Sequence, residues 1–322
     1  MPIQDRIDPE LTAPLEGLLA AFPGGFNAIP DIVARRALVA AVLAAGAEGV
    51  PKNQNVSSQE LVATGHDGAA EVAVRVYRPV GVKGTLPGLL YIHGGGMVLG
   101  SVDMADRSAV FLTDLVGCVT VSVEYRLAPE HPFPDAPEDC YTALVWMAGN
   151  AAELGVDPAR IAVYGASAGG GLAIATSLMA RDRGGPAICM QMPIYPMIDD
   201  RNFTASSHEI TDVGIWDRSG NIEAWAMYLG ASEGDSVSEY AAPARASDLS
   251  GLPPTFIDVG DVDMFRDEDI EFAARLMRAG VPTELHVNPG AYHAAEVFAP
   301  NAAMSKRIWA MRVDALKRGF NK

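Results

Sequence analysis

The sequence predicts an α/β domain with a mostly parallel central sheet and helices on both of its faces. Mainly apolar runs of strand length occur at six places: residues 88–92, 118–124, 160–164, 188–193, 255–259 and 283–287. Segments of helical length alternate with them, at residues 104–116, 135–154, 169–182, 267–279 and 301–318. Strands that alternate with helices pair in parallel, because each helix carries the chain back across the sheet.

Three further segments fall outside this alternation. Residues 8–48 predict two helices separated by the turn sequence Phe-Pro-Gly-Gly at 22–25. Residues 70–78 alternate apolar and other side chains as an antiparallel edge strand does. Between Pro196 and Leu249 the strand–helix rhythm breaks, and the stretch is rich in large apolar side chains: Phe203, Ile215, Trp216, Trp225, Met227 and Tyr228.

The strongest functional signal is the sequence Gly165-Ala-Ser167-Ala-Gly169, which follows the run at 160–164 and precedes a helical segment. A serine on such a sharp strand-to-helix turn has a strained backbone and projects its hydroxyl from the edge of the sheet. The flanking residues are glycine because a Cβ would clash in so tight a turn. Ser167 is therefore the candidate nucleophile, the alternative being a small-residue turn that merely contains a serine.

A second motif, His93-Gly-Gly-Gly96, directly follows the run at 88–92. Acyl transfer needs N–H donors aimed at the oxygen that becomes negative, and a glycine-rich loop lets its bare backbone approach the substrate. We expect these donors to be the amides of Gly95 and Gly96, together with that of Ala168. The spacing fits neither a phosphate-binding loop nor a dinucleotide fingerprint. His93, at the strand end, is expected to brace the loop.

The general base is expected among the three histidines that follow the serine, His208, His286 and His293. His286 lies in an alternating strand pattern, and His208 lies in a polar, irregular stretch with no strand before it. His293 lies in a loop directly after the last predicted strand, where a base can reach a serine at the same edge of the sheet. His293 is therefore the predicted base.

The orienting acid is expected after the penultimate predicted strand, where Asp261, Asp263 and Asp267 are candidates. The acid must be largely buried and must accept a hydrogen bond from the imidazole. Asp267, Glu268 and Asp269 are expected to be solvated residues of the next helix's first turn, where carboxylates suit the helix dipole. Asp261 and Asp263 therefore remain.

Taken together, these motifs resemble those of the bacterial hormone-sensitive-lipase-like esterases of the α/β-hydrolase superfamily. The layout is similar to that of acyl-esterases of the heroin esterase type. The matching motifs occur in the family's order over most of the chain: His93 to Gly96, Glu124 to Glu130 with Pro132 to Pro134, Gly165 to Gly170, Asp263 to Glu268, and Gly290 to His293. Two positions depart from the family pattern, since Ala166 replaces a usual acidic residue and Met264 a usual proline.

The resemblance implies an α/β-hydrolase fold with a helical cap. It implies a catalytic triad of Ser167, Asp263 and His293. It also implies an oxyanion hole formed by the amides of Gly95, Gly96 and Ala168. The expected organisation is N-terminal cap helices at 1–50, the first part of the core at 51–195, a second cap segment at 196–249 and the C-terminal part of the core at 250–322.

Composition and charge exclude several other classes of protein. The 322 residues suffice for one elaborated domain with a large core. A formal net charge of −16, with no Lys- or Arg-rich run, argues against nucleic acid or an anionic membrane as a partner. No signal peptide is predicted, and the apolar stretch at 37–45 is too short to span a bilayer. Cys118, Cys140 and Cys189 are expected to be buried free thiols, which favours a cytoplasmic protein.

These observations predict a serine-dependent carboxylic ester hydrolase that acts on small-molecule esters through an acyl-enzyme, with no metal or cofactor. The resemblance alone implies a preference for short acyl chains and a homodimer paired through the last strand, near residues 283–287. A lactone or amide hydrolase with the same triad is the alternative. A non-catalytic ligand-binding protein on this fold is a less favoured one, because such proteins typically lose the base.

Overall fold

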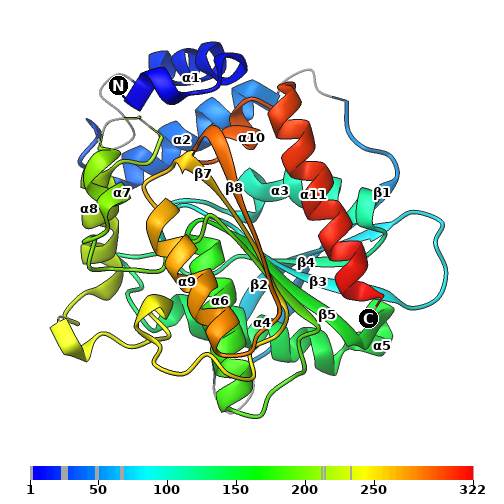
Figure 1. The fold of residues 1–322 in the computed structure, drawn as a ribbon. Coiled ribbons are helices and arrows are strands. Elements are labelled where there is room, and N and C mark those ends of the chain that lie inside the picture. Colours follow the sequence, from blue (N-terminus) through cyan, green and yellow to red (C-terminus); the bar gives the residue numbers. More distant parts are fainter. Residues whose placement is uncertain are drawn as a thin grey trace.

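A computed structural model of the chain describes residues 3–22, 28–47, 51–65, 69–211, 213, 215–232 and 234–321. An eight-stranded sheet forms its centre, in the order β1-β2-β4-β3-β5-β6-β7-β8 (Figure 1). The strands are β1 (Val56–Ala63), β2 (Val72–Pro79), β3 (Leu86–Ile92), β4 (Val119–Val123), β5 (Val156–Ala166), β6 (Met190–Ile194), β7 (Thr255–Val262) and β8 (Thr283–Tyr292). Pairing is antiparallel for β1 with β2 and for β2 with β4, and parallel from β4 through β8. The predicted α/β class is confirmed.

Helices cover both faces of this sheet (Figure 1). One face carries α3 (Val102–Val116) and α11 (Ala303–Phe320), and the other carries α4 (Asp135–Gly149), α6 (Ala168–Asp182) and α9 (Arg266–Arg278). The remaining helical segments are η1 (Ile3–Arg6), α1 (Pro9–Ala21), α2 (Ile32–Ala47), α5 (Ala151–Leu154), α7 (Ala205–Glu209), α8 (Arg218–Leu229), η3 (Gly234–Ser236), η4 (Pro243–Arg245) and α10 (Ala295–Phe298).

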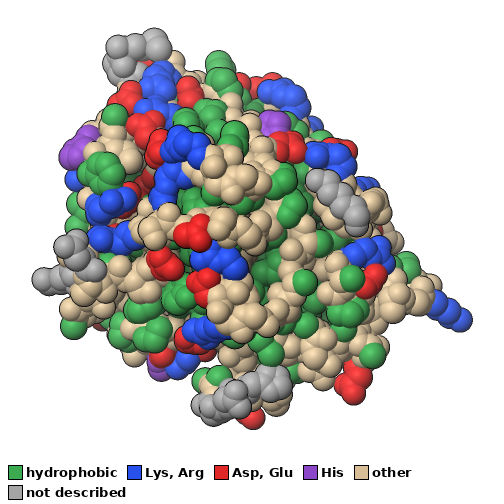
Figure 2. Space-filling view, turned by 60° about the horizontal axis from the view of Figure 1, so that its bottom comes forward, with side chains coloured by type: hydrophobic (Ala, Val, Ile, Leu, Met, Phe, Trp, Pro, Cys, Tyr) green, Lys and Arg blue, Asp and Glu red, His purple; other side chains and the backbone are tan. Residues whose placement is uncertain are grey.

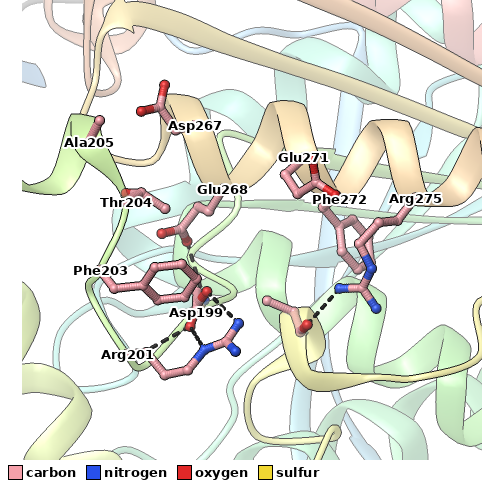
Figure 3. Close-up of a pocket in the computed structure, with 11 residues that line it drawn as sticks. Asp199, Arg201, Phe203, Thr204, Ala205, Asp267, Glu268, Glu271, Phe272 and Arg275 are labelled. Atoms are coloured by element: carbon pink, nitrogen blue, oxygen red, sulfur yellow. Dashed lines mark hydrogen bonds and ion pairs between the residues drawn. The ribbon is translucent and has the colours of Figure 1, made fainter.

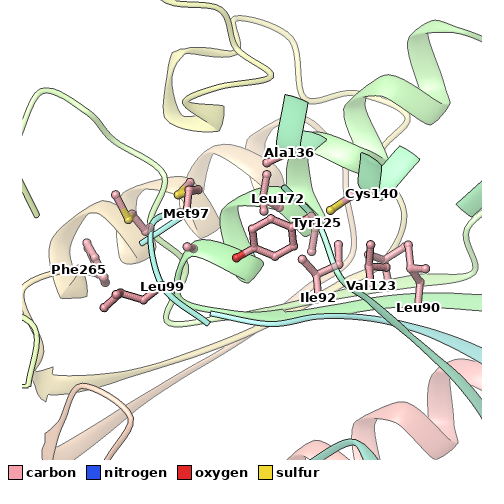
Figure 4. Packing of buried hydrophobic residues seen from close by; sticks show 14 of the residues in the cluster. Leu90, Ile92, Met97, Leu99, Val123, Tyr125, Ala136, Cys140, Leu172 and Phe265 are labelled. Carbon is pink, nitrogen blue, oxygen red and sulfur yellow. The ribbon is translucent and has the colours of Figure 1, made fainter. Parts of the chain in front are cut away.

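Alternate side chains of the strands supply two cores, because successive residues of a strand point to opposite faces. On β3, Leu90 and Ile92 pack with residues of α4 and α6, whereas Leu89 and Tyr91 pack with residues of α3 and α11. Figure 4 shows Leu90 and Ile92 in the first core, beside Cys140 of α4 and Leu172 of α6. The runs 89–92 of β3 and 161–164 of β5 are continuously apolar because both faces of the sheet are buried there.

The structure corrects two predictions about elements. The strand predicted at 70–78 as the edge of the sheet is β2, which lies between β1 and β4, so β1 is the edge. Sequence reasoning missed β1 because most of its side chains are exposed, and its polar sequence shows no alternation. The helix predicted over 135–154 is broken at Asn150 into α4 and α5.

Helices from two distant parts of the sequence meet at the carboxyl ends of the strands. There α1 and α2 lie near α7 and α8 (Figure 1). Arg35 of α2 forms an ion pair with Glu223 of α8, Nη1 to Oε2, at 2.8 Å. Arg36 donates from Nε to the carbonyl of Val98 at 2.7 Å and so ties α2 to the loop after β3. No helix in the described ranges has the length and apolar character needed to cross a membrane.

The molecular surface carries both acidic and basic side chains. On the face shown in Figure 2, basic and acidic side chains lie interspersed rather than gathered by sign. Many of them are paired: Arg183 with Glu138 and Arg278 with Glu271, both at 2.6 Å, are examples. Exposed pairs of this kind contribute only about 0–1 kcal/mol each to stability. The buried cores therefore stabilise the fold, and the surplus negative charge acts on solubility.

Candidate active site

Ser167 lies at the turn between β5 and α6, where the backbone is strained. Its φ is 59° and its ψ −121°, in a region that a residue with a side chain rarely adopts. A Cβ on Gly165 would overlap the carbonyl of Gly169, and one on Gly169 would overlap the carbonyl of Ile92. Only glycines on both sides allow the turn to be this tight, as the sequence pattern predicts.

The structure brings Ser167, His293 and Asp263 into one chain of hydrogen bonds. Ser167 Oγ lies 3.0 Å from His293 Nε2, and His293 Nδ1 lies 2.7 Å from Asp263 Oδ2. A carboxylate only accepts, so Nδ1–H donates to Asp263, and Nε2 is left to accept from the serine hydroxyl. The three residues are 7%, 8% and 0% exposed, so their interactions act largely out of water.

Three different strands position these side chains at one edge of the sheet. Ser167 follows β5, Asp263 follows β7 and His293 follows β8. Parallel strands bring their carboxyl ends to the same edge, so residues far apart in the sequence meet there.

Asp261 and Asp263, which the residue pattern alone leaves open, have different partners. Asp263 contacts the imidazole through Oδ2, and its Oδ1 accepts from the backbone N–H of Phe265 at 3.0 Å. Asp261 Oδ1 accepts from the backbone N–H of Gly290 at 2.6 Å, and its Oδ2 lies 3.3 Å from Arg6 Nη2. Asp261 therefore fixes the segment that leads to His293, without contact to the ring.

The prediction that Asp267, Glu268 and Asp269 are solvated is wrong for two of them. Glu268 is 4% exposed and Asp269 is 0% exposed, while the side chain of Asp267 is 30% exposed. Burial raises the pKa of the Glu268 carboxyl and that of the Asp269 carboxyl well above their usual ranges. The first turn of α9 faces inward because α9 packs on β7 and β8 and against the segment after β6.

Glu268 accepts from the backbone N–H of Ile198 at 3.0 Å and lines a cavity of about 260 Å³. Figure 3 shows this cavity beside α9, with Phe203 and the Arg201–Asp199 ion pair on its other side. None of the triad residues lines it. The cavity is therefore separate from the serine site.

The acid loop is held although Met264 replaces a proline. Met264 is buried, and its carbonyl accepts from the hydroxyl of Ser206 on α7 at 2.8 Å. The same hydroxyl accepts from the backbone N–H of Asp267, and Asp267 Oδ2 accepts from the backbone N–H of Ser206. These bonds fix the loop from α7.

The glycine loop after β3 lies against the serine turn. A Cβ on Gly94 would lie 2.7 Å from the carbonyl oxygen of Ala166 and 3.4 Å from Ser167 Cβ. Gly95 and Gly96 have φ of 123° and 63°, which suit glycine. Among the described residues, neither of their N–H groups, nor that of Ala168, donates to a backbone carbonyl. These three amides therefore remain the candidate donors for an oxyanion.

His93 lies beneath this loop and not in the hydrogen-bonded chain of the triad. Its ring stacks on Tyr125 with 4.1 Å between centroids, and Tyr125 donates its hydroxyl to the His93 carbonyl at 2.9 Å. His93 Nδ1 lies 2.9 Å from the carbonyl of Gly94. Burial lowers the pKa of His93 to about 4, so the ring is neutral at pH 7. These contacts brace the glycine loop.

The other two candidates for the base, His286 and His208, are not part of the hydrogen-bonded chain. His286 is on β8, with Nε2 2.8 Å from Glu284 Oε1, as the strand pattern predicts. His208 is exposed on the short helix α7. The three cysteines are free thiols, and Cys118 and Cys140 are buried as predicted, whereas Cys189 is only partly buried.

A buried ionic cluster, which the sequence analysis missed, lies beside the imidazole. Arg312 of α11 pairs with both oxygens of Asp258 at 2.7 and 2.8 Å, and its Nη1 donates to Glu296 Oε1 at 2.7 Å. Tyr195 donates its hydroxyl to the same Glu296 oxygen at 2.7 Å. The Tyr195 ring meets that of His293 edge-on, with centroids 4.8 Å apart. Glu296 lies only three residues after His293, but nothing in the sequence pairs it with Arg312.

Replacing Arg312 with methionine is expected to lower the free energy of unfolding by about 3–5 kcal/mol, because two carboxylates would stay buried without their cation. Chemical denaturation measures the change. Arg318→Met, on the same helix, is the control: its side chain is 50% exposed, and its loss should cost only about 0–1 kcal/mol. Similar losses in the two variants would contradict a stabilising role for the buried cluster.

Comparison with known proteins agrees with the α/β fold. The sequence profile of a family described as having the alpha/beta hydrolase fold matches residues 89–297. Carboxylesterase NlhH of Mycobacterium tuberculosis is 37% identical over 316 residues, which cover 97% of this chain and 97% of that protein. An arylesterase of Saccharolobus solfataricus is 36% identical over 238 residues, covering 74% and 76%. Among solved structures, a bacterial heroin esterase superposes with a TM-score of 0.91 at 41% identity, over 98% of both chains.

Proposed function

The chain belongs to the hormone-sensitive-lipase-like branch of the α/β-hydrolase fold family and is a carboxylesterase. We propose that it hydrolyses short-chain acyl esters through an acyl-enzyme on Ser167. The observation that carries the proposal is the hydrogen-bonded chain from Ser167 through His293 to Asp263. The glycine loop, which carries the proposed oxyanion donors, packs against the serine turn at Gly94.

In the acylation step, His293 Nε2 takes the proton from Ser167 while Oγ attacks the ester carbonyl carbon. The carbonyl oxygen becomes negative and is bound by the amides of Gly95, Gly96 and Ala168. His293 then gives its proton to the departing alcohol oxygen as the bond from carbon to that oxygen breaks. The imidazolium formed on the way is stabilised by Asp263, which also keeps Nδ1 protonated.

Deacylation repeats these steps with water in place of the serine hydroxyl. His293 takes a proton from water while the water oxygen attacks the acyl carbon, and the same amides bind the oxyanion. Ser167 leaves with the proton from His293, and the carboxylic acid is released. The whole cycle uses proton transfer and backbone donors of this chain.

The preference for short acyl chains is tested with p-nitrophenyl esters of increasing acyl length. We expect kcat/KM for the acetate and butyrate to exceed that for the octanoate and palmitate, because α2 and α8 lie at the carboxyl ends of the strands, where the serine is, and would limit the room for a long chain (Figure 1). A preference for palmitate would contradict the proposal. Hydrolysis of lactones or anilides faster than esters would assign the same triad to the alternative substrate class.

We also propose that two copies pair through β8. This strand is at the edge of the sheet, so the backbone groups on its outer side have no strand partner in the described chain. Val287, 37% exposed on this strand, would add apolar contact in such a pair. Size-exclusion chromatography with light scattering should give the mass of a dimer, and a monomer mass at micromolar concentration would contradict this.

A further inference from the structure

Trp216 contacts the glycine loop, although it is far from that loop in the sequence. A Cβ on Gly96 would overlap Trp216 Cη2 and would lie 2.7 Å from its Cζ2, so the benzene edge of the indole packs directly on this glycine. The same Cβ would lie 3.3 Å from that of Ala224 on α8. Trp216 is only partly buried.

Hydrogen bonds between buried side chains hold the indole in this place. Trp216 Nε1 donates to Asn221 Oδ1 at 3.0 Å, and Asn221 Nδ2 donates to Asn202 Oδ1 at 2.6 Å. Asn202 in turn donates to the carbonyl of Asp200 at 2.9 Å. Both asparagines are buried. The indole has one hydrogen-bonding group, the Nε1–H donor. Moving the ring aside would therefore break its bond to Asn221.

Among the described residues, the indole packs on the glycine loop and the imidazole has other aromatic neighbours. The leaving alcohol must lie against His293 Nε2, which protonates it. The aromatic neighbours of that imidazole are Tyr195 and Phe265, with centroids 4.8 and 5.3 Å away. Trp216 instead packs on the loop that binds the carbonyl oxygen. The acyl chain leaves the carbonyl carbon away from the departing alcohol, and therefore away from the imidazole.

We propose that Trp216 is the residue that limits acyl-chain length in this esterase, by closing the acyl pocket beside Gly96. The inference rests on the proposed ester hydrolysis at Ser167. An acetyl or butyryl group fits between the serine and the indole. A longer chain meets the ring and must displace it, with loss of the bond from Nε1 to Asn221.

The test compares wild type with Trp216→Ala and Trp216→Phe on p-nitrophenyl acetate, butyrate and octanoate. In Trp216→Ala the ratio of kcat/KM for octanoate to that for acetate should rise at least about tenfold, since a few methylenes in an apolar pocket discriminate by that much. The gain should come from faster octanoate hydrolysis. Trp216→Phe, which shortens the ring, should give an intermediate ratio. Thermal melting checks that both variants fold.

Phe203→Ala is the matched control, because Phe203 is an aromatic residue of the same cap segment that lines the separate cavity beside α9. Its ratio should stay within about twofold of wild type, as expected for an exposed position. A second series, acetate esters of alcohols of increasing length, should keep its profile in Trp216→Ala. The assignment is overturned by an unchanged acyl ratio in folded Trp216→Ala, by an equal change in Phe203→Ala, or by a change confined to the alcohol series. Wild type without ester hydrolysis would instead overturn the proposed function itself.

Discussion

Replacing Ser167 with alanine is expected to lower kcat for p-nitrophenyl butyrate by roughly 10⁴- to 10⁶-fold, as loss of the nucleophile does in other serine hydrolases. The reason is that Oγ is the atom that forms the acyl-enzyme, and His293 then has no hydroxyl to activate. The remaining donors would still polarise the ester carbonyl, so a small residual rate is expected. Steady-state kinetics with the purified variant measures the loss.

Ser177→Ala is the control for this experiment. Ser177 is a buried serine of the same helix, α6, and its hydroxyl donates to the carbonyl of Ala173 at 2.9 Å. We expect this variant to retain wild-type kcat. Hydrolysis that survives Ser167→Ala at a similar rate would show that another residue is the nucleophile.

Replacing Asp263 with asparagine is expected to lower kcat by about 10³- to 10⁴-fold. The new amide would present N–H to His293 Nδ1 and so favour the tautomer protonated at Nε2. An Nε2–H cannot accept the proton of Ser167, and the imidazolium would also lose the carboxylate that stabilises it. The main change should be in kcat and not in KM, because Asp263 is 0% exposed and does not face the substrate.

Asp261→Asn separates the two aspartates that the sequence leaves as alternatives. The amide oxygen can still accept from the backbone N–H of Gly290, so only the contact with Arg6 is weakened. We expect kcat to fall less than about tenfold, because Asp261 acts on the imidazole only through the chain. A larger loss in Asp261→Asn than in Asp263→Asn would transfer the role of the acid to Asp261.

The parts of the fold that sequence reasoning predicts well are those where burial is complete. The runs 89–92 in β3 and 161–164 in β5 are continuously apolar, because helices cover both faces there. The edge strand β1 has mostly exposed side chains, so neither alternation nor apolar content marks it. Its pairing with β2 depends on backbone hydrogen bonds, which any sequence provides.

The residues placed around the serine follow from local geometry and chain order. The turn at Ser167 needs glycines at fixed offsets, and His293 is the one histidine after the serine that directly follows a strand at the right edge. The choice of Asp263 over Asp261 rested on family resemblance, because both follow β7 within a few residues. Only the fold shows which of the two side chains points to the ring.

Contacts between distant segments account for what the sequence did not reveal. The acidic first turn of α9 suggests solvation, yet Glu268 and Asp269 are buried because the helix packs with that turn inward. Arg312 and Glu296 form an ion pair that no spacing predicts. Trp216 belongs to a stretch whose aromatic residues are equally suited to packing, and its contact with Gly96 is visible only in three dimensions.

The most direct test of the covalent mechanism is reaction with diethyl p-nitrophenyl phosphate, followed by mass spectrometry of the peptides. Attack by Oγ on phosphorus releases p-nitrophenolate and leaves a diethylphosphoryl group on the serine. We predict release of one equivalent per chain, loss of esterase activity in proportion, and the adduct on Ser167, with no adduct in Ser167→Ala and slow reaction in His293→Ala. Full activity without an adduct, or an adduct on another residue, would contradict catalysis by Ser167.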